Sequence, residues 1–179
     1  MLEFANTALI VIDMQTKLWN VMHEKEQLLE NTQKLLKGTQ LLGIPVVLTE
    51  QNPDGLGPTI PELKQIIPQV NPFPKFCFSC FKDESFARAI LELNRKQLLI
   101  CGIESHICVY QTAMDLLNQG FEVQIIADAV SSRAARNREI TLMRLQSEGA
   151  RLTTVEMLLF ELLQTARSPQ FRELSKIIK

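Results

Sequence analysis

The sequence predicts a three-layer α-β-α fold around a doubly wound, mainly parallel sheet of about six strands. Short apolar runs alternate along the chain with longer segments whose apolar residues recur at helical spacing. The short runs are apolar throughout, which is typical of strands that are covered on both faces. Because the 179 residues contain no linker, repeat or low-complexity tract, we expect a single domain over residues 1–179.

The first half of the chain is expected to form two buried strands, separated by one long helix. Gly43 and Pro45 would end this helix, since glycine accepts the left-handed conformation and proline cannot continue a helix. A Pro-rich stretch follows, which holds six of the eight prolines and predicts a loop. The expected elements are a strand at 8–12, a helix at 24–42, a strand at 46–49 and a loop at 52–74.

The second half of the chain predicts a regular alternation of helices and strands. Ser105 is placed to cap the helix that contains Cys108, and Ser168-Pro169 would begin a terminal helix. The expected helices are 83–94, 105–118, 134–148, 155–164 and the segment after 169, and the expected strands are 97–101, 123–126 and 151–154.

Composition and charge exclude several classes of partner. The net charge is −1, so nothing electrostatic favours nucleic acid or an anionic membrane as a partner. No apolar run approaches the ~20 residues of a membrane span, and the N-terminus lacks the pattern of a signal peptide. We therefore expect free cysteines and a cytoplasmic location, with an organelle matrix as the alternative.

Residues that can carry chemistry follow the expected strands. In parallel sheets the reacting groups gather at the carboxyl ends of strands, where Asp13 and the segment 102–108 would lie. Cys108 falls in the first turn of a helix, where the helix dipole can lower a thiol pKa from about 8.5 by one or more units. The backbone amides there can also hold an oxyanion. The alternative is that Cys108 is a small buried filler.

An ordered set of motifs spans nearly the whole chain. The segment 102–113 reads Gly-Ile-Glu-Ser-His-Ile-Cys-Val-Tyr-Gln-Thr-Ala, and the other matches are 11–15, Lys75 and 127–133. Together they resemble the isochorismatase-like cysteine hydrolase superfamily, which includes nicotinamidases, carbamoyl-amidases and many proteins without an assigned substrate. The segment 49–57 is most similar to the small isochorismatase-domain-containing proteins.

This resemblance implies a catalytic triad of Asp13, Lys75 and Cys108. It also implies a non-proline cis peptide between Ile103 and Glu104, with the amides of Glu104 and Cys108 as the oxyanion hole. The implied reaction is metal-independent hydrolysis of a small amide-type C–N bond through a thioester. Asp13 would accept the thiol proton and later return it to the leaving amine, while Lys75 holds the charges in place.

The sequence departs from nicotinamidases at their metal site, which is built from an Asp and two histidines near the second strand. The only histidines here, His23 and His106, do not fit that spacing. We therefore expect no catalytic metal and no cofactor, and a small molecule as substrate. The family commonly self-associates, so the resemblance also implies a homo-oligomer, a dimer or tetramer, and the apolar terminal segment 171–178 is compatible with this.

Further residues are candidates by position alone. The candidate pocket residues are Gln15, Leu18, Trp19, Glu104 and His106, although ordinary packing explains Leu18 and Trp19 equally well. Asp128 and Arg133 are expected to form a structural pair that supports the site. Two other functions stay open at this point: a non-catalytic homo-oligomeric interaction module that keeps the fold, and a dithiol oxidoreductase that uses Cys77 and Cys80.

Overall fold

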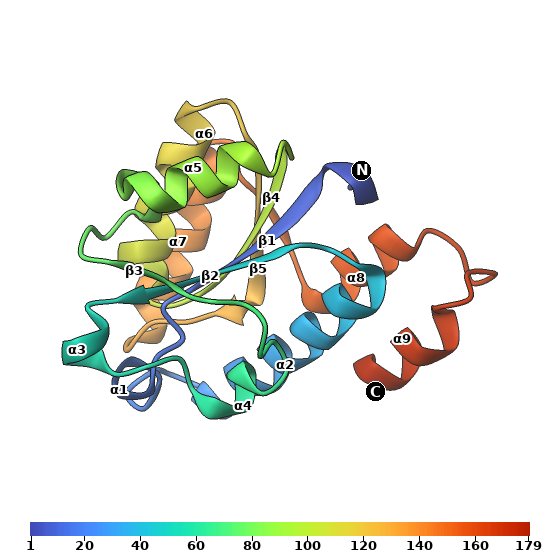
Figure 1. Cartoon of the computed structure of the whole chain (residues 1–179), viewed down its shortest axis with the longest axis horizontal. Helices are drawn as coiled ribbons and strands as arrows, with labels where there is room; N and C mark the ends of the chain where they lie inside the picture. The colour runs from blue at the N-terminus through green and yellow to red at the C-terminus, as the bar shows by residue number, and fades with distance from the viewer.

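The computed structural model describes residues 1–179 and contains one six-stranded sheet with helices on both faces (Figure 1). Each pair of neighbouring strands is parallel, and the strand order is β3-β2-β1-β4-β5-β6. The predicted fold class is therefore confirmed. The strands are β1 (Thr7–Ile12), β2 (Val46–Gln51), β3 (Phe73–Lys75), β4 (Gln97–Gly102), β5 (Glu122–Val130) and β6 (Arg151–Thr153).

The continuous apolar runs form the central strands because both of their faces are covered. In β1, Leu9 and Val11 point into one hydrophobic cluster, while Ile10 and Ile12 point into the other. Successive side chains of a strand point to opposite faces, so a strand between two helical layers must be apolar at every position. The sheet thus separates two cores.

The helices divide between the two faces of the sheet. Helices α2, α8 and α9 pack on one face, and α5, α6 and α7 lie on the other (Figure 1). No helix is both long and apolar enough to cross a bilayer. The helices are α1 (Thr16–Trp19), α2 (Lys25–Leu42), α3 (Pro53–Leu56), α4 (Pro61–Lys64), α5 (Glu84–Glu92), α6 (Tyr110–Asn118), α7 (Ala135–Ser147), α8 (Val155–Leu163) and α9 (Phe171–Ile178).

The Pro-rich stretch is more ordered than the loop that the sequence predicts. It contains α3, α4 and the edge strand β3, which pairs with β2. Pro74 is compatible with β3 because an edge strand leaves one row of its backbone groups unpaired. Lys75 is therefore the last residue of a strand and does not lie in a loop.

The terminal helix differs from the prediction in its start and in its surroundings. It begins after Gln170, and the Ser168 side chain is not its cap. Leu174 is fully buried, and Phe171 and Ile178 pack against the core on the α2 side. The apolar residues of this segment are thus used within the chain, so they provide no support for self-association.

The strand order reverses between β1 and β4, and in open α/β sheets this is where ligands bind. β4 ends at Gly102, which has a φ of 115°. A Cβ at this position would lie 2.0 Å from the carbonyl oxygen of Ile12, so only glycine fits beside β1. The next peptide bond, between Ile103 and Glu104, is cis.

The helix after β4 starts differently from the prediction. Its first turn is a π-helical turn, η3 (Ser105–Val109), which leads directly into α6. Ser105 does not cap the helix, because its hydroxyl is hydrogen-bonded to the hydroxyl of Ser132. Cys108 lies within η3 and is buried.

Candidate active site

Three segments that are far apart in the sequence bring Asp13, Lys75 and Cys108 together. Asp13 directly follows β1, Lys75 ends β3 and Cys108 lies in η3, after β4. The ammonium of Lys75 donates a hydrogen bond of 2.7 Å to Oδ2 of Asp13, and both side chains are sealed from solvent. The Asp13 carboxylate is also close enough to the Cys108 thiol that, next to burial, its charge raises the pKa of the thiol. A carboxylate therefore stands between an ammonium and a thiol.

Lys75 is held by four acceptors around its ammonium group. Besides Asp13, these are Oε1 of Gln51 at 2.7 Å and the backbone carbonyls of Cys77 and Phe78 at 3.3 Å. Burial alone would lower the pKa of Lys75, but the Asp13 carboxylate opposes this both as a neighbouring charge and as a hydrogen-bond acceptor, and the pKa of Lys75 is raised. Lys75 is therefore a permanent cation beside the thiol.

Both oxygens of Asp13 are committed to partners within the protein. The hydroxyl of Thr49 donates to Oδ1 at 2.7 Å, and the thiol of Cys80 is 3.7 Å from that hydroxyl. Burial raises the pKa of Cys80 to about 12, so it stays protonated. Thr49 and Cys80 were not among the predicted site residues. The sequence does contain an indication of the role of Thr49, since a polar residue near the carboxyl end of a buried strand is a candidate for the site.

The expectation that helix position lowers the pKa of Cys108 is wrong. Burial is the largest cause, and together with the nearby charge of Asp13 it raises the pKa of the thiol, while Lys75 opposes this only in part. The resting group is thus a thiol next to a carboxylate that can take its proton.

A cavity of about 180 Å³ opens beside Cys108. Its lining is mostly apolar and comes from α1, β2, α3, the segment after β3, and η3 with the residue before it. Of the predicted pocket residues, Leu18 and Glu104 line this cavity. The full lining is Leu18, Gln51, Leu56, Phe78, Glu104, Ile107 and Cys108.

The remaining candidate pocket residues lie outside the cavity lining. Gln15 is fully buried, and its side-chain amide hydrogen-bonds the backbone of Gln51 in both directions. Trp19 packs against the core and donates to the carbonyl of Lys25. His106 is hydrogen-bonded through Nδ1 to Ser132 at 2.9 Å. Gln15 thus fixes the strand that carries Gln51, while Trp19 and His106 contact other parts of the protein.

Glu104 connects the cavity to the segment after β5. Its Oε2 accepts hydrogen bonds from the backbone amide of Arg133 at 3.0 Å and from Nε of Arg133 at 3.1 Å. The predicted pair of Asp128 and Arg133 is therefore wrong, since Asp128 accepts from the backbone amide of Val155 instead. The backbone amide of Glu104 has no acceptor within the chain.

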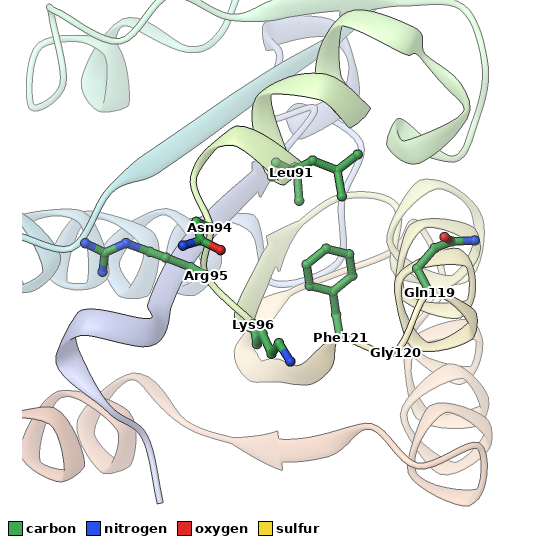
Figure 2. Close-up of a pocket in the computed structure, with 8 residues that line it drawn as sticks. Leu91, Asn94, Arg95, Lys96, Gln119, Gly120 and Phe121 are labelled. Carbon is green, nitrogen blue, oxygen red and sulfur yellow. The ribbon is translucent and has the colours of Figure 1, made fainter.

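A second hollow of about 240 Å³ lies at the amino-terminal ends of the strands, where β4 and β5 begin (Figure 2). Its most basic residue, Arg95, already has partners within the chain, because its guanidinium donates hydrogen bonds to the backbone carbonyls of Phe4 and Thr7. No thiol, histidine or carboxylate lines it. No cluster of three or more histidine, cysteine or carboxylate side chains is arranged to hold a metal ion. Of these two hollows, only the one beside Cys108 therefore brings a thiol and a carboxylate together.

Comparison with known proteins agrees with this architecture. The family model described as "Isochorismatase domain" matches residues 7–157. The bovine isochorismatase domain-containing protein 2 is 40% identical over 177 residues, which cover 97% of this chain and 83% of the bovine protein.

Two solved structures share the fold over nearly the full chain. The MAR1 ribonuclease from Caenorhabditis elegans has a TM-score of 0.91 and 32% identity, with coverage of 99% of this chain and 91% of that one. YcaC from Pseudomonas aeruginosa, solved with hexane-2,5-diol and covalent acrylamide, has a TM-score of 0.93 and 25% identity, with coverage of 99% and 89%. The chain belongs to the isochorismatase family, whose members include hydrolases.

Proposed function

We propose that this protein is a metal-independent amidohydrolase in which Cys108 is the nucleophile, Asp13 the general base and Lys75 the charge-holding group. One observation carries the proposal. A carboxylate that is sealed from solvent is paired with an ammonium at 2.7 Å, and it is close enough to a cavity-lining thiol that, next to burial, its charge raises the pKa of that thiol. This arrangement suits nucleophilic catalysis, because a neighbouring base can activate a thiol.

The geometry supports a two-stage reaction on a small amide. Asp13 takes the thiol proton while the sulfur of Cys108 forms a bond to the carbonyl carbon. The C–N bond then breaks, and Asp13 returns the proton to the nitrogen, so that ammonia or an amine leaves and a thioester remains. Water, deprotonated by Asp13, attacks the thioester to give a carboxylic acid and the free thiol.

Two backbone amides are the proposed donors to the substrate oxygen as it becomes negative. The amide of Glu104 is unused within the chain, and the amide of Cys108 belongs to the same segment. Fixed amides at this point would stabilise the tetrahedral intermediate in a site that excludes water. Lys75 keeps its charge throughout, because its pKa is raised.

One relative gives further support to a reactive nucleophile in this fold. YcaC from Pseudomonas aeruginosa was solved with covalent acrylamide. Acrylamide is an electrophile that thiols add to, and it also carries an amide. A small amide-bearing compound is therefore a reasonable occupant of the cavity beside Cys108.

Ribonuclease activity, which the name of the C. elegans relative suggests, fits this cavity less well. A site that cleaves RNA binds phosphates through basic side chains. Lys75, a cation whose charge acts on Cys108, is sealed from solvent and paired with Asp13. The cavity instead presents Glu104 and apolar side chains.

The two alternatives from the sequence are also supported less well. A dithiol oxidoreductase needs an attacking thiol of low pKa, whereas burial raises the pKa of Cys80 to about 12. A non-catalytic interaction module has no need for a buried carboxylate–ammonium pair beside a thiol, because such a pair is costly to desolvate.

The test is release of ammonia from a panel of small primary amides, with RNA included as a competing substrate class. Replacing Cys108 with serine should lower kcat/KM by at least about 1,000-fold without loss of fold, since it changes one atom of the nucleophile. Acid quenching during turnover should trap an acyl group on Cys108, visible by peptide mass spectrometry.

The matched control is Cys77→Ser, which changes a half-buried thiol whose side chain takes no part in the hydrogen bonds around Lys75. This variant should keep full activity. Loss of activity on Cys77→Ser together with full activity on Cys108→Ser would overturn the proposal in favour of the dithiol function.

A further inference from the structure

The cavity beside Cys108 contains one hydrogen-bonding side-chain group that the protein leaves free. Gln51 is fully engaged, since its Oε1 accepts from Lys75 and its Nε2 donates to the carbonyl of Phe76. Cys108 is the nucleophile. Four other lining residues, Leu18, Leu56, Phe78 and Ile107, are apolar. The Glu104 carboxylate is the remaining polar side chain in the lining.

The two oxygens of Glu104 have different surroundings. Oε2 accepts both hydrogen bonds from Arg133, while Oε1 accepts none from any residue. The side chain is 7% exposed, and Oε1 is not among the unpartnered polar atoms that are fully sealed. Glu104 lines the cavity, and Oε1 is its carboxylate oxygen that no donor of the chain occupies. A buried acceptor without a donor is unfavourable unless a ligand or water supplies one.

We propose that Glu104 is the specificity-determining residue of this site and that it selects substrates bearing an N–H donor or an ammonium group. The inference rests on the proposed hydrolase function. The substrate class is a small primary amide whose acyl part has an apolar chain and ends in a donor group. An acyl part that carries a carboxylate is excluded, because two like charges would meet in a water-poor cavity.

The fold anchors this carboxylate well. Arg133 binds Oε2 through its backbone amide and its guanidinium, so the side chain cannot turn away from the cavity without losing both hydrogen bonds. The Arg133 side chain is 62% exposed, whereas that of Glu104 is 7% exposed. The free oxygen is thus held in one direction, as selective recognition requires.

The inference can be tested without any turnover, by the rates at which methanethiosulfonates modify Cys108. Each reagent transfers its thioalkyl group to the thiolate and releases methanesulfinate. The methyl reagent is neutral, the 2-aminoethyl reagent is cationic and the 2-sulfonatoethyl reagent is anionic. The Cys77→Ser background leaves Cys108 as the only thiol with access, since Cys80 and Cys101 are fully buried.

With rates normalised to those of glutathione, the cationic reagent should react about tenfold or more faster than the anionic one. In Glu104→Gln this ratio should fall to within about threefold, while the neutral reagent keeps its rate. The unchanged neutral rate separates charge selection from a disturbed site. Glu139→Gln, which removes a surface carboxylate also paired with an arginine, should leave the ratio unchanged.

A substrate series tests the same inference during turnover. Butanamide, 4-aminobutanamide and succinamate have nearly the same size but end in a methyl, an ammonium and a carboxylate. We expect kcat/KM to be highest for 4-aminobutanamide and lowest for succinamate, and Glu104→Gln to reduce the difference about tenfold or more.

Equal rates for the cationic and anionic reagents in the unchanged site, or an unchanged ratio in Glu104→Gln, would overturn the inference. A charge preference in labelling without turnover of any amide would contradict the hydrolase function and not the selectivity of the cavity. The two proposals can therefore fail separately.

Discussion

The Cys108 thiol lies next to a carboxylate and an ammonium that are both removed from water, and this environment determines when it can react. Because burial and the Asp13 charge raise its pKa, the thiolate is scarce in the free protein at neutral pH. Proton transfer to Asp13 then accompanies attack on a bound carbonyl, so nucleophilicity appears when substrate is present. Small electrophiles in bulk water should meet a poorly reactive thiol.

The pH dependence of alkylation tests this description of Cys108. A group with a raised pKa gains thiolate by about tenfold per pH unit below that pKa. In the Cys77→Ser background, the rate of modification by iodoacetamide should therefore rise continuously from pH 7 to 9. A plateau below pH 8 would mean that the thiol pKa is lowered and would contradict the cause assigned here.

Some site residues follow from the sequence and others do not. Asp13 and Cys108 can be predicted, because each follows a recognisable buried strand and belongs to an ordered motif. The hydrogen bond between Thr49 and Asp13 joins residues 36 apart, and local patterns contain no information on such a contact. The predicted partner of Arg133 was incorrect for the same reason. Asp128 and Glu104 are both carboxylates that follow strands of the sheet, and local patterns do not indicate which of them Arg133 contacts.

The elements of the fold differ in how strongly their residues specify them. β1 and β4 are continuous apolar runs that are buried on both faces, and such runs indicate strands reliably. β3 has three residues and contains Pro74, so its pairing with β2 is set by the tertiary fold and not by local preference. Likewise, the hydroxyl of Ser105 is hydrogen-bonded to Ser132, a contact that no helix-capping pattern can indicate.

The end of β4 tolerates no side chain, and two glycines allow a matched test. Gly102→Ala would place a Cβ 2.0 Å from the Ile12 carbonyl oxygen, a backbone atom that cannot move without breaking the sheet. We expect a loss of about 4 kcal/mol or more in the free energy of unfolding, or an insoluble protein. The measurement is urea denaturation followed by circular dichroism.

Gly120→Ala is the control for backbone strain. Gly120 has a φ of 81°, but nothing lies within 4 Å of its added Cβ. It should therefore lose only about 1–2 kcal/mol, the cost of a side chain in the left-handed region. Equal losses for the two variants would show that strain, and not the approach of β1 to β4, explains the need for glycine at 102.

At the scale of the whole molecule, two hydrophobic cores share one sheet. The polar site lies at the carboxyl ends of the strands, where the strand order reverses. Cys108 itself belongs to the hydrophobic cluster on the side of α5, α6 and α7, so apolar packing extends up to the reactive groups. The single domain, the cytoplasmic location and the dimer or tetramer stay predictions from the sequence. Several large apolar side chains are on the surface, among them Phe76 at 75% and Met143 at 69% exposure.

Self-association is the prediction that belongs to this scale. Singly exposed apolar side chains are common on monomers as well, so the prediction rests on the resemblance to a family that commonly self-associates. Light scattering coupled to size-exclusion chromatography should give a mass of two or four chains at micromolar concentration. A mass of one chain over the whole concentration range would contradict it.

The proposed catalytic trio is assembled from β1, β3 and η3, and Asp13 and Lys75 are 62 residues apart. No fragment shorter than this span contains both groups, and neither is paired until the sheet has formed between them. Recovery of enzymatic turnover after dilution from denaturant would therefore count only molecules in which β3, β2, β1 and β4 have all joined. Spectroscopic signals from individual helices can return earlier, so catalysis would serve as the strictest assay of refolding for this chain.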